Sequence, residues 1–156
     1  MSDTKELKQD FWKALNASPF VFLHLDNEPH NAVPMTAQLD KDADSEVWFF
    51  TRKDHTLAKG GPATATFAGK DNQLFARFSG TLSHERSRER LEKQWNQIIE
   101  AWFPGGKDDP NLLMLRMDLG QAEIWNSDLG FVDNVKMLLG FDSRDEAKKE
   151  HTETVL

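Results

Sequence analysis

The residues of this chain best suited to chemistry are aromatic side chains placed beside glycine and proline. Residues 102–110 form the segment Trp-Phe-Pro-Gly-Gly-Lys-Asp-Asp-Pro, and Trp125 follows after a short strand-like stretch. Glycine lets the backbone approach a ligand closely, and an indole ring buries a large flat area at low entropic cost. The combination indicates one side of a binding site for a planar ring. The same residues also suit a helix end with core aromatics, and the segment alone leaves both interpretations open.

The polar residues point to fewer possible sites. Thr51 is the best polar candidate, because a hydroxyl at a strand end beside Arg52, Lys53 and Lys59 suits a phosphate group. Asp108-Asp109 could ligate a cation, but loop carboxylates are usually solvated or capping groups. We find no catalytic acid, base or nucleophile, and we expect no metal site, because the histidines lack metal-ligand spacing: they are His24, His30, His55, His84 and His151.

Composition narrows the class of protein. The chain has 156 residues, a formal net charge of −7 and no cysteine. This length predicts a single domain with a core at about 5–140 and a charged tail at 142–156. The acidic balance argues against nucleic acid as a partner, and the absence of a long apolar run argues against a membrane span. The lack of cysteine fits a cytoplasmic protein.

The apolar and polar pattern predicts a mainly β protein with flanking helices. Strands joined by short turns favour an antiparallel sheet, and about six of them with few helices fit a small barrel better than a sandwich. Leu91, Trp95, Ile98 and Trp102 share one face of the expected long helix. The expected elements are a helix ending at Pro19, strands at 20–25, 32–39, 47–51, 63–68 and 74–83, and a helix at 85–103. One strand or a strand pair follows at 112–117 and 121–125 around a corner at 118–120, and then a helix at 131–139.

Several short motifs occur together in an order that resembles a known family. They are Pro34-Met35-Thr36, Trp48-Phe49-Phe50-Thr51, Gly80-Thr81-Leu82, Trp102-Phe103-Pro104-Gly105-Gly106, Asp109-Pro110 and Ala122-Glu123-Ile124-Trp125. Each motif alone is weak, but their joint order and spacing resemble the general stress protein branch of the pyridoxamine 5'-phosphate oxidase-like proteins. The resemblance covers roughly residues 5–140. It implies a split β-barrel that binds FMN as a homodimer, with the flavin at the subunit interface.

The resemblance also implies positions for the cofactor-binding residues. The strand at 33–36 would pass along the flavin ring with its backbone, and Phe50 and Thr51 would face the ribityl and phosphate side. The loop at 55–57 would contact the phosphate, and Trp125 would lie against the flavin. Met35 is equally suited to fill the core. The implied cofactor-binding set is Val33, Pro34, Met35, Thr36, Phe50, Thr51, His55, Thr56, Leu57 and Trp125.

The chain departs from the family pattern at the phosphate side and after Trp125. The family often has Arg where this chain has Val33, and usually has Ser and Lys where this chain has His55 and Leu57. Losing cationic anchors weakens the binding of a phosphate that carries nearly two negative charges. The Arg-Leu-His-Asp-Arg type segment that holds the substrate of true pyridoxamine phosphate oxidases is also missing, so we expect no oxidation of vitamin B6 phosphates.

The sequence therefore predicts a flavin-binding general stress protein in which FMN, or else FAD, would carry any redox chemistry. Whether the protein is an enzyme stays open. The alternative is a flavin-free dimeric module on the same barrel that binds or senses another ligand. Two features distinguish the hypotheses: whether Arg52, Lys53 or Lys59 reaches the mouth of the pocket in place of the missing anchors, and whether the aromatic pocket stays open.

Overall fold

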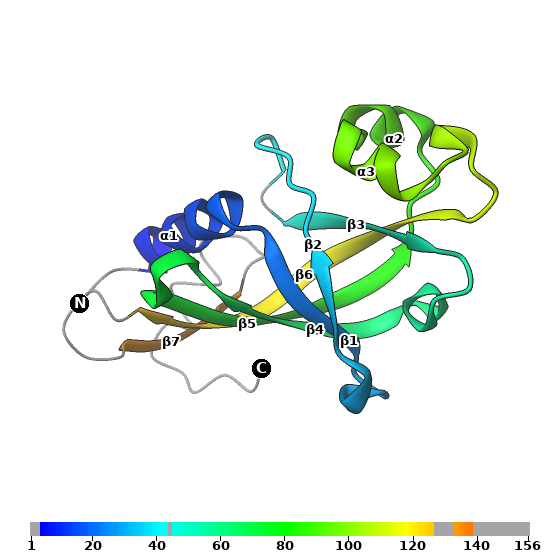
Figure 1. Ribbon diagram of the computed structural model, residues 1–156. Coiled ribbons are helices and arrows are strands. Elements are labelled where there is room, and N and C mark those ends of the chain that lie inside the picture. The colour runs from blue at the N-terminus through cyan, green and yellow to red at the C-terminus, as the bar shows by residue number, and fades with distance from the viewer. Residues whose placement is uncertain (1–3, 44, 127–132, 139–156) are drawn as a thin grey trace.

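The chain forms one antiparallel sheet that curls into a nearly closed barrel, as predicted (Figure 1). The computed structural model describes residues 4–43, 45–126 and 133–138. The strand order is β2-β1-β4-β5-β6-β3, and β7 pairs with β6. The elements are α1 (Thr4–Ala17), β1 (Phe20–Leu25), η1 (Pro29–Asn31), β2 (Val33–Thr36), β3 (Glu46–Arg52), η2 (Thr56–Lys59), β4 (Gly61–Ala68), η3 (Lys70–Asn72), β5 (Leu74–His84), α2 (Arg88–Gln94), α3 (Gln97–Trp102), η4 (Gly106–Asp108), β6 (Leu112–Asn126) and β7 (Asp133–Leu138).

The barrel interior is filled by alternate residues of its strands. Alternation follows from strand geometry, since successive side chains point to opposite faces of a sheet. Helix α1 covers part of this core, and Phe11 is its central contact, with ring centroids 6.4 Å from Phe67 and 5.3 Å from Phe78. The fully buried core side chains include Leu7, Leu15, Leu23, Phe49, Phe78, Leu115, Met117 and Ile124.

A β-bulge divides β6 into two halves. Phe78 of β5 pairs with Ala122, whereas Gly80 pairs with Leu119, so β6 carries one extra residue at this point. The inward-facing positions of β6 accordingly change from odd to even numbers across the bulge. The sequence predicted one strand or a strand pair around a corner at 118–120, and the structure shows one long strand with a bulge there. The first half of β6 pairs with β3, and the second half pairs with β7.

The long helix predicted at 85–103 is wrong. Two short helices, α2 and α3, replace it, because the chain leaves helical geometry at Trp95 and the Asn96 side chain accepts a hydrogen bond from the Ile99 amide at 3.0 Å. Such an N-cap begins a new helix. The predicted apolar face is wrong in part as well, since Ile98 and Trp102 are each 75% exposed.

The helix predicted at 131–139 is also wrong where the structure describes it. Residues 133–138 form β7, which pairs antiparallel with β6, for example through Val135 opposite Ile124. Residues 134–137 alternate polar and apolar types, so the segment fits a strand as well as a helix. Pairing with the edge of β6 decides in favour of the strand. Residues 131, 132 and 139, together with the tail at 142–156, lie outside the described residues. No helix in the described ranges is long and apolar enough to cross a membrane.

Candidate functional site

The barrel closes incompletely between β2 and β3. In the described part of the chain, the only ladder pair that joins the two sides is Gln38 with Trp48, through backbone hydrogen bonds of 2.7 and 3.0 Å. Beyond this bridge, β2 (33–36) runs along one side and the end of β3 (50–52) along the other, without pairing. We call this stretch the seam. It leaves main-chain donors and acceptors on both sides free to meet a ligand.

The candidate residues other than Trp125 lie on β2, at the end of β3 and at the start of η2. Helix η2 follows β3 through a turn in which the His55 amide bonds Arg52 O at 3.0 Å. An ion pair of 2.9 Å between Lys59 and Glu28 then ties η2 to the segment that leads into β2. These contacts place 55–57 beside the end of β3, and the end of η2 beside the segment that leads into β2. That the 33–36, 50–51 and 55–57 segments form a common site stays a prediction.

The side chains within this group differ in what they can offer a ligand. Pro34 and Thr36 are exposed on the outer face of β2, whereas Val33 and Met35 pack against the core. The partly buried Phe50 makes an edge-on contact with Trp95, with ring centroids 6.0 Å apart. The ring of Phe50 is thus fixed by the helical segment above the seam.

The phosphate-side candidates are held by local hydrogen bonds. His55 Nδ1 accepts from the Leu57 amide at 3.1 Å and so caps η2. The Leu57 side chain is buried in the core, which leaves only its backbone near the surface, while Thr56 is exposed. Thr51 is 8% exposed and lies near the end of β3.

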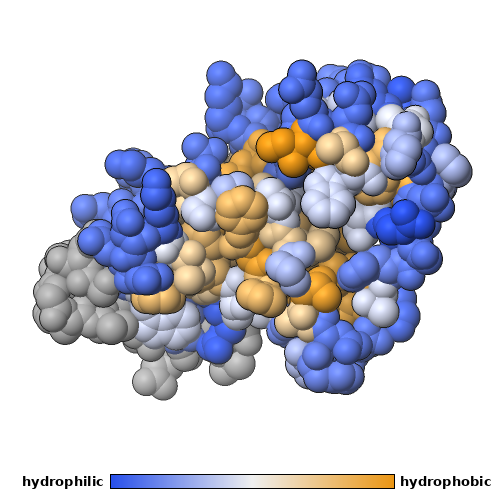
Figure 2. All heavy atoms as spheres, in the orientation of Figure 1, coloured by the Kyte–Doolittle hydropathy of each residue, from blue (hydrophilic) through white to orange (hydrophobic). Residues whose placement is uncertain are grey.

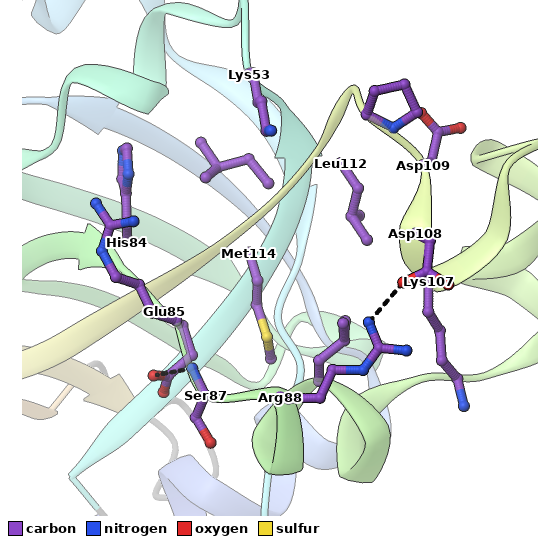
Figure 3. Close-up of a pocket in the computed structure, with 14 residues that line it drawn as sticks. Lys53, His84, Glu85, Ser87, Arg88, Lys107, Asp108, Asp109, Leu112 and Met114 are labelled. Carbon is purple, nitrogen blue, oxygen red and sulfur yellow. Dashed lines mark hydrogen bonds and ion pairs between the residues drawn. The ribbon is translucent and has the colours of Figure 1, made fainter.

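Of the three possible replacement anchors, two already make ion pairs. Arg52 lies 3.3 Å from Asp54, and Lys59 pairs with Glu28. Both cations are exposed, and exposed ion pairs are weak enough to exchange partners. Lys53 instead points into a pocket of about 440 Å³ between the start of β6, the end of β5 and α2 (Figure 3).

Residues 107–110, at the end of the 102–110 segment, line one side of this pocket. Asp109 accepts hydrogen bonds from the amides of Asn111 (2.8 Å) and Gly105 (2.9 Å), which lower the pKa of its carboxyl. Asp108 pairs with Arg88 at 2.9 Å (Figure 3). The capping interpretation of Asp108-Asp109 is therefore supported. No group of three or more potential metal ligands occurs in the described ranges.

Helix α2 is fastened to the barrel beside the seam by a buried carboxylate. Asp40 lies 2.5 Å from Arg90 and 2.8 Å from Lys93, and its side chain is almost fully buried. Arg90 also stacks over the Trp48 ring at 4.1 Å, and the Trp48 indole N–H donates to Glu85 at 3.0 Å. Lys93, then Arg90 and the Asp42 amide, hold the pKa of Asp40 well below its usual value.

We expect Asp40→Asn to lower the melting temperature at neutral pH. A carboxylate with a depressed folded-state pKa stabilises the fold above its unfolded pKa of about 3.9, and this contribution is lost as the pH falls below that value. The gap between wild type and Asp40→Asn should therefore narrow on acidification, which thermal melts from pH 7 to pH 3 would measure. Asp42→Asn is the matched control, since Asp42 is exposed and 4.0 Å from Lys93. A constant gap would contradict this role.

Trp125 lies apart from the seam, with partners that the sequence did not reveal. It sits opposite Phe75 in the β5–β6 ladder, and the Arg77 guanidinium lies 5.7 Å from the centroid of its ring. Arg77 also forms a 2.7 Å ion pair with Glu123, whose side chain is only 5% exposed. The alternation of β5 and β6 could have placed these residues on one face, but their register across the bulge could not be deduced from the sequence.

A family model agrees with the motifs. The model for pyridoxamine 5'-phosphate oxidase like proteins matches residues 6–141. The chain belongs to this family. The match covers nearly the same residues as the predicted resemblance. A search of the curated proteins finds no match.

Solved structures of the family are similar along most of this chain. A general stress FMN/FAD binding protein from Xanthomonas citri is 41% identical, with a TM-score of 0.74, and the alignment covers 88% of this chain and all of that one. A candidate general stress family protein from Xanthomonas campestris pv. campestris is 41% identical, with a TM-score of 0.75 over 90% of this chain and all of that one. General stress protein 26 from Bacillus anthracis, at 14% identity, 85% and 98% coverage and a TM-score of 0.67, shares the fold.

The residues at the seam fit a flavin nucleotide in their chemistry. A hydroxyl (Thr51), two exposed cations (Arg52 and Lys59) and unpaired strand edges supply donors for a phosphate and for ring carbonyls. Aromatic surface for the ring comes from Phe50 and, on another part of the barrel, from Trp125. The pyridoxamine 5'-phosphate oxidase like fold of this chain thus carries a workable flavin donor set despite the loss of the usual Ser and Lys.

Proposed function

We propose that this protein binds FMN at the seam, in a homodimer whose second protomer supplies Trp125, and serves a stress-linked redox or flavin-handling role in the cytoplasm. The observation that carries the proposal is the seam, where β2 and the end of β3 lie on either side and the 55–57 segment lies beside the end of β3. The 41% identity to a general stress protein described as FMN/FAD binding supports it.

The position of Trp125 is the reason for involving a second protomer. The register places Pro34, Phe22, Thr66, Arg77 and Glu123 in one row across five strands of the outer face. Four inter-strand spacings amount to roughly 19 Å along the curved sheet. Along β6, Trp125 lies eleven residues beyond Met114, the ladder partner of Phe50, which is roughly 36 Å of strand. Trp125 lies two residues beyond Glu123. A ring held at the seam therefore does not touch Trp125 of its own protomer, whereas a second copy could bring its Trp125 to the seam.

The outer face between the seam and Trp125 has the character of a protein contact surface. Phe20 and Phe22 of β1 are 63% and 53% exposed, and Phe75 of β5 is 39% exposed. On the face of the molecule where β1 and β2 lie, hydrophobic residues gather in the middle and hydrophilic residues surround them (Figure 2). A surface of this kind marks an interaction site, and a symmetric dimer would use it on both copies.

When bound, the flavin would supply hydride or single-electron chemistry, and this chain would orient and tune it. We propose no oxidation of vitamin B6 phosphates, because the substrate-holding segment of those enzymes is missing from the sequence. The second candidate is the flavin-free ligand-binding or sensor module. It is favoured by His55 and Leu57, which stand where the family has its phosphate anchors and are used here to build η2.

The test is to saturate the purified protein with FMN, remove unbound flavin by gel filtration, and record the visible spectrum and the mass by light scattering. We expect a retained flavin spectrum near one FMN per protomer and a dimer that persists at low micromolar concentration. A colourless dimer would favour the sensor module. A monomer that retains flavin would contradict the shared site.

A further inference from the structure

A cation on the outer face of β5 is held in a fixed position beside Trp125. Arg77 is 48% exposed, yet one of its terminal nitrogens is bound to the buried carboxylate of Glu123 at 2.7 Å. The same guanidinium lies 5.7 Å from the centroid of the Trp125 ring. The contacts with Glu123 and Trp125, two residues apart on β6, therefore orient the Arg77 side chain.

Most other arginine pairs in the described residues differ from this arrangement; the exception is Arg90 with the buried Asp40, where Arg90 itself is only 23% exposed and fastens α2. Arg88 and Arg116 pair with carboxylates that are themselves substantially exposed, at Asp108 and Asp118. Such surface pairs contribute little and rearrange easily. Glu123 is 5% exposed, and a buried carboxylate without its cation is costly, so Arg77 is kept in place by the fold. A guanidinium has five N–H donors in a rigid fork, and the pair with Glu123 uses only part of this capacity.

We propose that Arg77 contacts the pyrimidine end of the flavin ring, where the ring carries its carbonyl oxygens and the negative charge of its reduced form. The inference rests on the proposed function, in which Trp125 lies against a flavin bound at the seam of the second protomer. A flat ring against Trp125 brings one of its edges to the neighbouring guanidinium. Arg77 then favours the bound flavin through charge-assisted hydrogen bonds and favours the anionic reduced form through its charge.

The experiment compares wild type with Arg77→Lys, the double variant Arg77→Met/Glu123→Gln, and the control Arg116→Met. The double variant removes the cation without leaving a charged carboxylate buried alone. Arg116 is a similar half-exposed arginine, but it lies where β6 pairs with β3 and makes its ion pairs with Glu46 and Asp118. Circular dichroism and thermal melts establish that each variant is folded. The readouts are the FMN dissociation constant from flavin fluorescence, the affinity of the bound flavin for sulfite, which adds at N5, and the two-electron midpoint potential.

We expect the double variant to bind FMN at least about tenfold more weakly. Its sulfite affinity and midpoint potential should also fall, while Arg77→Lys keeps most of both and Arg116→Met matches wild type. Unchanged FMN affinity and potential in the double variant would overturn the contact. So would an Arg77→Lys protein that is as impaired as the double variant, because charge would then not be the cause. A wild-type protein that takes up no FMN would overturn the flavin function itself, which is a different failure.

Discussion

Mixed dimers that carry Trp125→Ala in one protomer and Thr51→Val in the other should recover tight FMN binding at half of their sites. In the proposed arrangement, each flavin is held by Thr51 of one protomer and Trp125 of the other. The mixed dimer then contains one site with both residues intact and one site with neither. If each site were built from a single protomer, every site in the mixed dimer would lack one residue.

The two single variants give the FMN affinities with which the mixed dimer is compared. Trp125→Ala removes the aromatic face beneath the ring, and Thr51→Val removes a hydroxyl donor to a charged phosphate while keeping the side-chain shape. Each change should weaken FMN binding by about tenfold or more. Thr51→Val should affect riboflavin less than FMN, since riboflavin has no phosphate, and equal losses for both ligands would rule out a phosphate contact.

Mixed dimers can be isolated by co-expression with two different affinity tags, and bound FMN titrated by fluorescence quenching. The expected titration has two phases. One FMN per dimer binds tightly, and the second FMN binds with a lower affinity than either single variant shows. A single phase at the affinity of the single variants would mean that Trp125 and Thr51 act in separate sites. A Trp102→Ala protein is the control for loss of an indole, because Trp102 is 75% exposed on α3 and is not among the residues proposed to touch the flavin.

The barrel could be predicted from the sequence because most of its information is local. Strands β1, β3 and β4 are bounded by turns that contain Gly, Asn or Asp, and the alternation of Ala and Thr in β4 matches the burial that the structure shows. The errors fall where a local pattern fits two structures equally well. At 133–138 the edge of β6 selects a strand, and at Asn96 a side-chain cap divides a helix that the apolar spacing alone would continue.

The candidate site was accessible from the sequence only in part. Motif positions brought the 33–36, 50–51 and 55–57 segments into one hypothesis, and the structure places 55–57 beside the end of β3. The ion pair from Arg77 to Glu123 could not be foreseen, because it depends on pairing between residues 46 positions apart. That pairing is set by the register of β5 against β6, which a bulge shifts by one residue.

Gly80→Ala should destabilise the protein more than almost any other single methyl addition, by at least about 3 kcal/mol. A Cβ atom at Gly80 would be forced into the backbone carbonyl oxygen of Asp118, and it would lie 3.1 Å from the Leu119 Cα. These are main-chain atoms of a paired strand, so they cannot rotate away as the end of a flexible side chain could. Relief would require β5 and β6 to separate at the bulge.

The same change should reach the flavin site through the bend of β6. The bulge joins the half of β6 that pairs with β3, beside Thr51, to the half that carries Trp125. Separating β5 from β6 at the bulge would therefore change the position of Trp125 relative to Thr51. Chemical denaturation and FMN titration of Gly80→Ala should therefore show lower stability and weaker flavin binding together. Gly120→Ala on the facing strand is the matched control, because a Cβ there meets only Ser79 O at an ordinary 3.5 Å. If both variants were equally stable, the close approach of the two backbones would not be what requires glycine at position 80.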